Sequence, residues 1–151
     1  MKSSLNHSKY VLLADDDADD CMFFQDALEQ VSKDLRLQTA NDGHQLMQLL
    51  EATVPPNPDL IFLDLNMPKK NGFECLEEIR QTEKLKNIPV VIFSTSDRND
   101  AVRTTYEMGA SIYVQKPYSF SRLIDTIREV LSMDLKEGFK QPPFHNYFYA
   151  F

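Results

Sequence analysis

The stretch Leu60-Ile-Phe-Leu-Asp64 decides the fold, because four apolar residues run directly into a carboxylate. A short, uninterrupted apolar run is typical of a strand that is covered on both faces, as in a parallel sheet. Two further runs of this kind, at residues 10–14 and 89–94, lie before and after it along the chain. The sequence therefore predicts a buried parallel sheet whose strands end at polar residues.

Short β-rich segments alternate with longer segments of helical period over most of the chain. We expect five strands, at residues 10–14, 35–40, 60–64, 89–94 and 111–115. We expect five helices, at residues 18–31, 43–52, 72–81, 99–108 and 120–131. Breakers such as Gly109 and Pro117 lie between these segments. The alternation favours an α/β fold with a doubly wound, five-stranded parallel sheet.

The composition limits the kinds of partner. Sixteen Lys and Arg against 23 Asp and Glu give a net charge of −7. An acidic surface repels phosphate backbones and anionic lipids, so we expect no nucleic acid and no membrane as partner. No apolar run approaches the about 20 residues of a membrane helix, and the first residues do not resemble a secretion signal. Cys21 and Cys75 lack metal-ligand spacing and are expected as reduced thiols in a cytoplasmic protein.

Polar residues follow four of the five expected strands. Asp15 and Asp16 come after the first strand, Asp64 ends the third, Ser94 ends the fourth and Lys116 follows the fifth. In open α/β sheets, ligands bind outside the carboxyl ends of the strands. We therefore expect three carboxylates, a hydroxyl and an ammonium group to converge on one edge of the sheet.

The expected cluster indicates a metal and a phosphoryl group. Neighbouring carboxylates do not all stay ionised unless a cation compensates their charge. Oxygen ligands without His or Cys suit Mg²⁺ or Mn²⁺, and Mg²⁺ commonly binds one or two carboxylates together with a phosphate. A carboxylate in such a site can act as a nucleophile. The sequence therefore predicts phosphoryl transfer to an Asp, with the metal and Lys116 neutralising charge.

Four pieces of the sequence together resemble the receiver domain of bacterial two-component response regulators: Leu13-Ala-Asp-Asp-Asp17, Leu63-Asp-Leu-Asn-Met-Pro68 with Gly72, Ser94, and Tyr113-Val-Gln-Lys-Pro117. The resemblance covers about residues 8–133. It implies a flavodoxin-like (βα)₅ fold with strand order 2-1-3-4-5.

The resemblance also implies a role for each residue of the cluster. Asp64 would accept a phosphoryl group from a sensor histidine kinase. Asp16, Asp64 and the backbone carbonyl of Asn66 would bind Mg²⁺ (or Mn²⁺), with Asp15 assisting through water. Lys116 would hold the phosphoryl group.

Further roles implied by the resemblance concern switching. The hydroxyl of Ser94 would reach a phosphoryl oxygen, and Tyr113 would turn inward as that hydroxyl moves; Thr95 or Ser96 could share the role of Ser94. Asn66 and Ser96 match positions that tune a slow self-dephosphorylation. The chain would then be a switch rather than an enzyme.

Other interpretations remain open at this stage. Asp17, Asp19 and Asp20 are expected to cap the first helix and to favour its dipole. A degenerate receiver would act as an interaction module without phosphorylation. A phosphatase of the dehalogenase-like type would need a second acid two residues after the nucleophile, where this chain has Asn66.

Residues 134–151 are expected to form a tail rather than a separate output domain. A receiver without an output domain would signal to a downstream partner protein or a phosphotransfer protein. A homodimer is possible as a further assembly. A phytochrome-type sensor is one hypothesis for the histidine kinase. Six of the thirteen residues 139–151 are aromatic. Disordered tails are poor in aromatics, so we expect this tail to pack near Tyr113, against the last two helices or the fifth strand, or to dock on a second chain.

Overall fold

The computed structural model describes residues 10–52, 57–133, 135 and 141–151. Its strands are β1 (Tyr10–Ala14), β2 (Arg36–Ala40), β3 (Leu60–Leu63), β4 (Val90–Ser94), β5 (Ile112–Gln115) and β6 (Phe148–Tyr149). Its helices are α1 (Ala18–Val31), α2 (Gly43–Glu51), α3 (Gly72–Gln81), α4 (Asn99–Glu107) and α5 (Phe120–Ser132), followed by a 3₁₀ turn at Phe144–Asn146. The five predicted strands and five predicted helices are therefore confirmed, with ends that differ by one residue at most.

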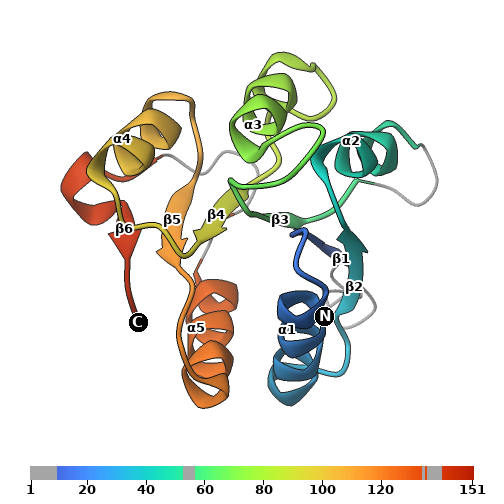
Figure 1. The fold of residues 1–151 in the computed structure, drawn as a ribbon, viewed down its shortest axis with the longest axis vertical. Coiled ribbons are helices and arrows are strands. Elements are labelled where there is room, and N and C mark those ends of the chain that lie inside the picture. The colour runs from blue at the N-terminus through green and yellow to red at the C-terminus, as the bar shows by residue number, and fades with distance from the viewer. Residues whose placement is uncertain (1–9, 53–56, 134, 136–140) are drawn as a thin grey trace, which may run out of the picture.

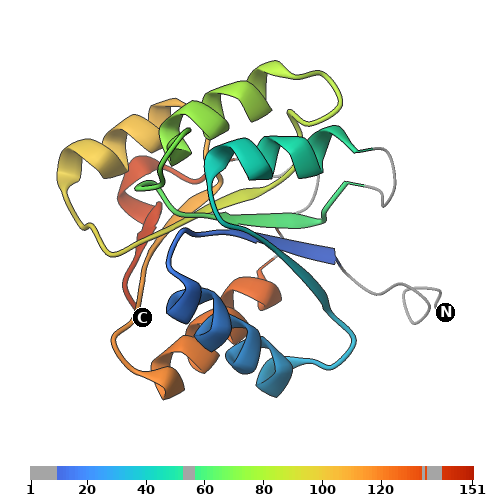
Figure 2. The same ribbon diagram turned by 45° about the vertical axis from the view of Figure 1, so that its right-hand side comes forward.

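All the strands pair in parallel, in the order β2-β1-β3-β4-β5-β6. Helices α2, α3 and α4 cover one face of the sheet, and α1 and α5 cover the other (Figures 1 and 2). This is the doubly wound, flavodoxin-like arrangement that was predicted. The expected number of strands needs one correction, because the C-terminal segment adds β6 beside β5.

Each face of the sheet has its own apolar core. On the α1/α5 face, the rings of Phe24, Phe62 and Phe93 pack edge to face, with centroids 4.9 to 5.8 Å apart. Strands β1, β3 and β4 are buried along their whole length, which explains why they lack the alternation of a half-exposed strand. The two cores hold the strands rigidly and therefore also hold the residues at the strand ends.

Polar side chains cap the helices at the carboxyl edge of the sheet. Asp17 accepts hydrogen bonds from the backbone N–H groups of Asp19 and Asp20 at the start of α1. Asn71 and Glu74 form a reciprocal capping box at the start of α3. These caps stabilise the first turns and fix where each strand–helix loop ends. The predicted capping role of Asp17 is confirmed.

The C-terminal segment (residues 141–151) packs back onto the domain. Its strand β6 pairs with β5, so that Phe148 lies opposite Tyr113. Tyr147 is fully buried on the α4 side of the sheet, whereas Tyr149 and Phe151 pack toward the α5 side. The prediction that the tail packs near Tyr113 is confirmed for these residues, while Phe139 lies outside the described residues.

Candidate functional site

Three carboxylates meet at the carboxyl ends of two adjacent strands. Asp15 and Asp16 directly follow β1, and Asp64 directly follows β3. The sheet ladder continues into them, because the Asp64 N–H donates to the carbonyl of Ala14 at 3.0 Å. One carboxylate oxygen from each of the three lies within 4.8 Å of the other two. The structure therefore brings together the three carboxylates that the sequence predicts at this edge.

The carboxylates differ in burial. Asp15 is 1% exposed and Asp64 is 7% exposed, whereas Asp16 is open to solvent. Burial raises the pKa of Asp64 to about 6; the negative charge of Asp15 adds to this rise, and Lys116 opposes it. The site thus holds more negative charge than its surroundings favour, and a donor set made of carboxylate oxygens fits Mg²⁺ or Mn²⁺.

Lys116 supplies the positive charge of the site. Its Nζ lies 2.7 Å from Oδ2 of Asp15, 3.0 Å from Oδ2 of Asp20 and 3.4 Å from Oδ2 of Asp64. Its backbone N–H donates to the Ser94 carbonyl at 2.8 Å, which fixes the residue at the end of β5. Burial disfavours the ammonium group, but the carboxylates outweigh this and raise the pKa of Lys116. Lys116 therefore stays protonated and paired with these carboxylates.

The sequence interpretation missed Asp20 as a member of the site. It was assigned to the first turn of α1, and it does lie there, but its carboxylate also reaches Lys116. These two residues are 96 positions apart in the chain. No local sequence pattern could predict this contact, because the contact depends on where α1 lies relative to the end of β5. We use the name "acidic site" for Asp15, Asp16, Asp20, Asp64 and Lys116.

A tight loop after β3 places Asn66 beside Asp64. Gly72 begins α3 and donates its N–H to the carbonyl of Leu65 at 2.9 Å. A Cβ on Gly72 would clash with the Asp64 carbonyl, so this close approach of backbone to backbone requires glycine. The N–H of Asn66 points to Oδ1 of Asp64 at 3.5 Å. The loop thus supports the Asp64 carboxylate from its own backbone.

Ser94, Ser96 and Tyr113 form a hydrogen-bonded group next to the acidic site. Ser94 is fully buried at the end of β4, and its Oγ accepts from the Ser96 N–H at 3.2 Å. The Tyr113 hydroxyl donates to the Ser96 carbonyl at 2.8 Å, with its ring fully buried. Tyr113 is therefore placed inward, against the loop that follows Ser94.

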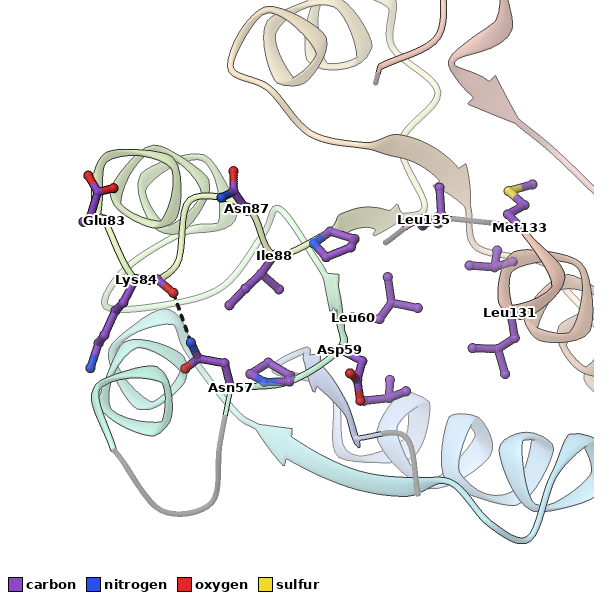
Figure 3. Close-up of a pocket in the computed structure, with 14 residues that line it drawn as sticks. Asn57, Asp59, Leu60, Glu83, Lys84, Asn87, Ile88, Leu131, Met133 and Leu135 are labelled. Carbon is purple, nitrogen blue, oxygen red and sulfur yellow. Dashed lines mark hydrogen bonds between the residues drawn. The ribbon is translucent and has the colours of Figure 1, made fainter. Parts of the chain in front are cut away.

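A groove of about 690 Å³ lies at the opposite end of the sheet (Figure 3). Its lining includes Leu60 at the start of β3 and Leu131 near the end of α5. Its lining shares no residue with the acidic site, and among the residues that the structure describes it holds no group of three or more carboxylates placed to bind a metal. The described residues thus concentrate their chemistry at the carboxyl edge.

Comparison with known proteins agrees with this geometry. Residues 11–128 match the family described as the response regulator receiver domain. Response regulator Rcp1 of Synechocystis sp. is 36% identical over 140 residues, which cover 90% of this chain and 95% of Rcp1.

Solved structures give the same result. The phosphorylated cyanobacterial phytochrome response regulator RcpA is 34% identical, with a TM-score of 0.77 over 82% of this chain and 91% of RcpA. The Mn(2+)-bound form of response regulator Rcp1 is 36% identical, with a TM-score of 0.75 over 89% of this chain and 99% of that one. The fold, the acidic site and these matches agree, and the chain belongs to the response regulator receiver domain family.

Proposed function

We propose that this protein is a phosphorylation-controlled switch in which Asp64 accepts a phosphoryl group from a sensor histidine kinase. The observation that carries the proposal is the convergence of Asp15, Asp16, Asp64 and Lys116 from three different strands. Such a cluster has little use in holding the fold together, because its carboxylates outnumber its ammonium group. It suits an incoming phosphoryl group and a divalent cation.

The chemical step follows from the position of Asp64. A carboxylate oxygen attacks phosphorus, the phosphorus–nitrogen bond of the donor's phosphohistidine breaks, and its electron pair returns to the imidazole. Asp16, Asp64 and the Asn66 carbonyl would hold Mg²⁺ (or Mn²⁺), with Asp15 acting through water. The metal, when bound, neutralises charge on the phosphoryl oxygens. The similarity to Rcp1, which has been solved in a Mn(2+)-bound form, supports this assignment.

The remaining residues would read the phosphoryl group. Lys116 would exchange its contact with Asp64 for a phosphoryl oxygen, and the Ser94 hydroxyl would bind a second one. Tyr113 would report the movement of Ser94 to the outer face of α4 and β5, which shifts the population toward a form that a partner binds. Asn66 and Ser96 flank the phosphoryl position and would tune its slow loss by hydrolysis.

The upstream and downstream partners are inferred from relatives. RcpA is described as a cyanobacterial phytochrome response regulator, and this supports a phytochrome-type histidine kinase as the donor. The output would pass to a downstream partner protein or a phosphotransfer protein, and a homodimer stays a prediction.

None of the described helices is long and apolar enough to cross a membrane. Cys21 and Cys75 are free thiols in the structure. The cytoplasmic location stays a prediction.

Intact-mass analysis after incubation with acetyl phosphate and Mg²⁺ tests the proposal. We expect the mass of one phosphoryl group to be added to the wild-type chain. The matched control, Asp64→Asn, keeps the shape of the side chain but removes the nucleophile, and it should gain nothing. Omission of Mg²⁺ should also prevent the reaction.

The competing hypothesis is a receiver that binds partners without being phosphorylated. It predicts that no phosphoryl group is added even when Mg²⁺ binding has been verified by calorimetry. That result would contradict our proposal and would direct attention to the C-terminal segment as the functional surface.

A further inference from the structure

The C-terminal segment and the loop that follows Ser94 contact the same side chain. Tyr113 donates its hydroxyl to the Ser96 carbonyl at 2.8 Å, and its backbone N–H donates to the Tyr147 carbonyl at 3.0 Å. The Tyr113 ring centroid lies 5.6 Å from that of Phe148 and 6.3 Å from that of Tyr147. Tyr113 therefore connects the segment with the loop next to the acidic site.

The segment is also bound firmly to α4. The hydroxyls of Tyr147 and Thr105 lie 2.8 Å apart and share a buried hydrogen bond. The Gln141 side-chain amide donates to the carbonyls of Tyr106 and Ala110, at 2.7 Å each. These contacts join the segment to α4, which begins five residues after Ser94. The position of the segment therefore depends on α4 as well as on Tyr113.

Further contacts extend the attachment along α4. The hydroxyl of Tyr106 donates to the Pro142 carbonyl at 2.8 Å, and the guanidinium of Arg103 lies 4.2 Å from the centre of the Phe144 ring. Figure 1 shows the segment beside β5 and α4, at the edge of the sheet. A segment that makes these polar contacts, buries Tyr147 fully and packs its other aromatic rings half-buried is a built part of the fold.

The segment occupies the space on the outer side of Tyr113. Phe148 and Tyr147 cover this side, and Tyr113 has no exposed surface. An outward turn of the ring would break the bond to Ser96 and would need Phe148 to leave. The docked segment therefore favours the inward position of Tyr113.

We propose that the C-terminal segment is an intramolecular clamp, in which Phe148 and Tyr147 act as positioning residues that hold Tyr113 inward and so stabilise the phosphorylated form. This inference rests on the proposed function of Asp64. Coupling between two sites is reciprocal, so phosphorylation also tightens the docking of the segment by the same factor. Coupling energies in proteins commonly correspond to about 5- to 150-fold changes in an equilibrium constant.

Phe148→Ala in the full chain tests the clamp, with Tyr149→Ala as the matched control. The control removes an aromatic ring from the next residue of β6, which packs on the opposite face of the sheet and away from Tyr113. We expect Phe148→Ala to lower the phosphorylated fraction at equal acetyl phosphate and Mg²⁺ by at least about five-fold, as the ratio of phosphorylated to free chain. Tyr149→Ala should change this ratio less than two-fold.

Hydrogen exchange supplies a readout that does not depend on phosphorylation. Without acetyl phosphate, Phe148→Ala should speed amide exchange at Ser96 and Tyr113, whereas Tyr149→Ala should leave both slow. Adding acetyl phosphate and Mg²⁺ to the wild-type chain should slow exchange within residues 141–151.

The outcomes separate the two proposals. If the wild-type chain takes no phosphoryl group, the proposed function fails, and the exchange at Ser96 still decides whether the segment holds Tyr113. If the wild-type chain is phosphorylated but the two variants have equal phosphorylated fractions or equal exchange at Ser96, the clamp is wrong.

Discussion

The acidic site and the C-terminal edge belong to the same sheet and meet at β5, which leads into Lys116 and pairs with β6, but they are held together in opposite ways. In the acidic site, one ammonium group faces three carboxylates, two of which are buried. At the C-terminal edge, formed by residues 141–151 with α4 and β5, aromatic rings pack closely and Tyr147 has a partner for its buried hydroxyl. The acidic site thus carries an excess of negative charge that a cation would neutralise. The C-terminal edge needs no ligand, because its rings are packed and the buried hydroxyl of Tyr147 is hydrogen-bonded.

This difference indicates that the acidic site serves the chemistry of the protein, whereas the C-terminal edge contributes to its stability. Among the described residues, every buried side-chain nitrogen or oxygen has a hydrogen-bond partner, so the acidic site is not a packing defect. Its cost is electrostatic, and a divalent cation or a loss of charge relieves it. Substitutions at the two regions should therefore change stability in opposite directions.

Tyr147→Ala should give the largest effect, because it removes a fully buried ring from the C-terminal edge. We expect the free energy of unfolding to fall by about 3 kcal/mol, the lower end of the range for truncating a large buried aromatic side chain. Urea denaturation measures it. Tyr149→Ala, at a half-buried ring, should cost less; equal losses would show that the edge is not centred on Tyr147.

Asp64→Asn should stabilise the metal-free protein at pH 7. The pKa of Asp64 is raised to about 6 in the folded chain, so its ionisation costs stability between about pH 4 and pH 6, and the full cost is present above that range. The neutral amide avoids this cost, and we expect a gain of about 1–3 kcal/mol.

Thermal unfolding followed over pH checks this prediction. The wild-type and Asp64→Asn curves should coincide below about pH 4, where the carboxyl group is protonated in both states, diverge between about pH 4 and pH 6, and stay apart above about pH 6. Asp34→Asn, at an exposed carboxylate outside the site, is the control and should change little. A destabilised Asp64→Asn would mean that its pairing with Lys116 outweighs the cost of burial.

Tyr147→Phe isolates the hydroxyl at the C-terminal edge. It keeps the ring and removes the hydrogen bond to Thr105, which should lower the free energy of unfolding by about 1 kcal/mol. A double-mutant cycle with Thr105→Val measures the coupling directly. Additive losses would show that the two hydroxyls do not stabilise each other.

Asp20→Asn should give the smallest effect, a two- to five-fold weaker binding of Mg²⁺, which is about the energy of a partly exposed ion pair. Without Asp20, Lys116 is drawn toward Asp15 and Asp64 and competes with the metal there. Calorimetry with Mg²⁺ measures it. Asp19→Asn removes the same charge from the same turn without a contact to Lys116, and equal effects of the two would exclude the ion pair as the cause.

Local patterns were sufficient for much of this molecule. Apolar runs predicted β1, β3 and β4 because strands covered on both faces need apolar residues at every position. Asp15, Asp16 and Asp64 were predicted to meet because parallel strands bring their carboxyl ends to one edge. In each case, the signal lies in residues adjacent in sequence. The topology of a parallel sheet then brings the strand ends together.

Other features depended on contacts between distant segments. Asp20 reaches Lys116 only because α1 lies beside the end of β5, and β6 has two residues, too few to carry a strand pattern. The aromatic content of the tail predicted that it would pack near Tyr113, but it gave no indication that the packing would include a sixth strand.

The sequence by itself determined the order of the first five strands and the five helices along the chain, the edge at which the charges gather and the type of ligand that they favour. These properties follow from residue type and spacing, which act over a few positions of the chain. The tertiary structure alone decided which carboxylates share Lys116 and which rings enclose Tyr113. Such pairings depend on distances of a few ångströms between residues far apart in sequence, and packing of the whole domain sets those distances.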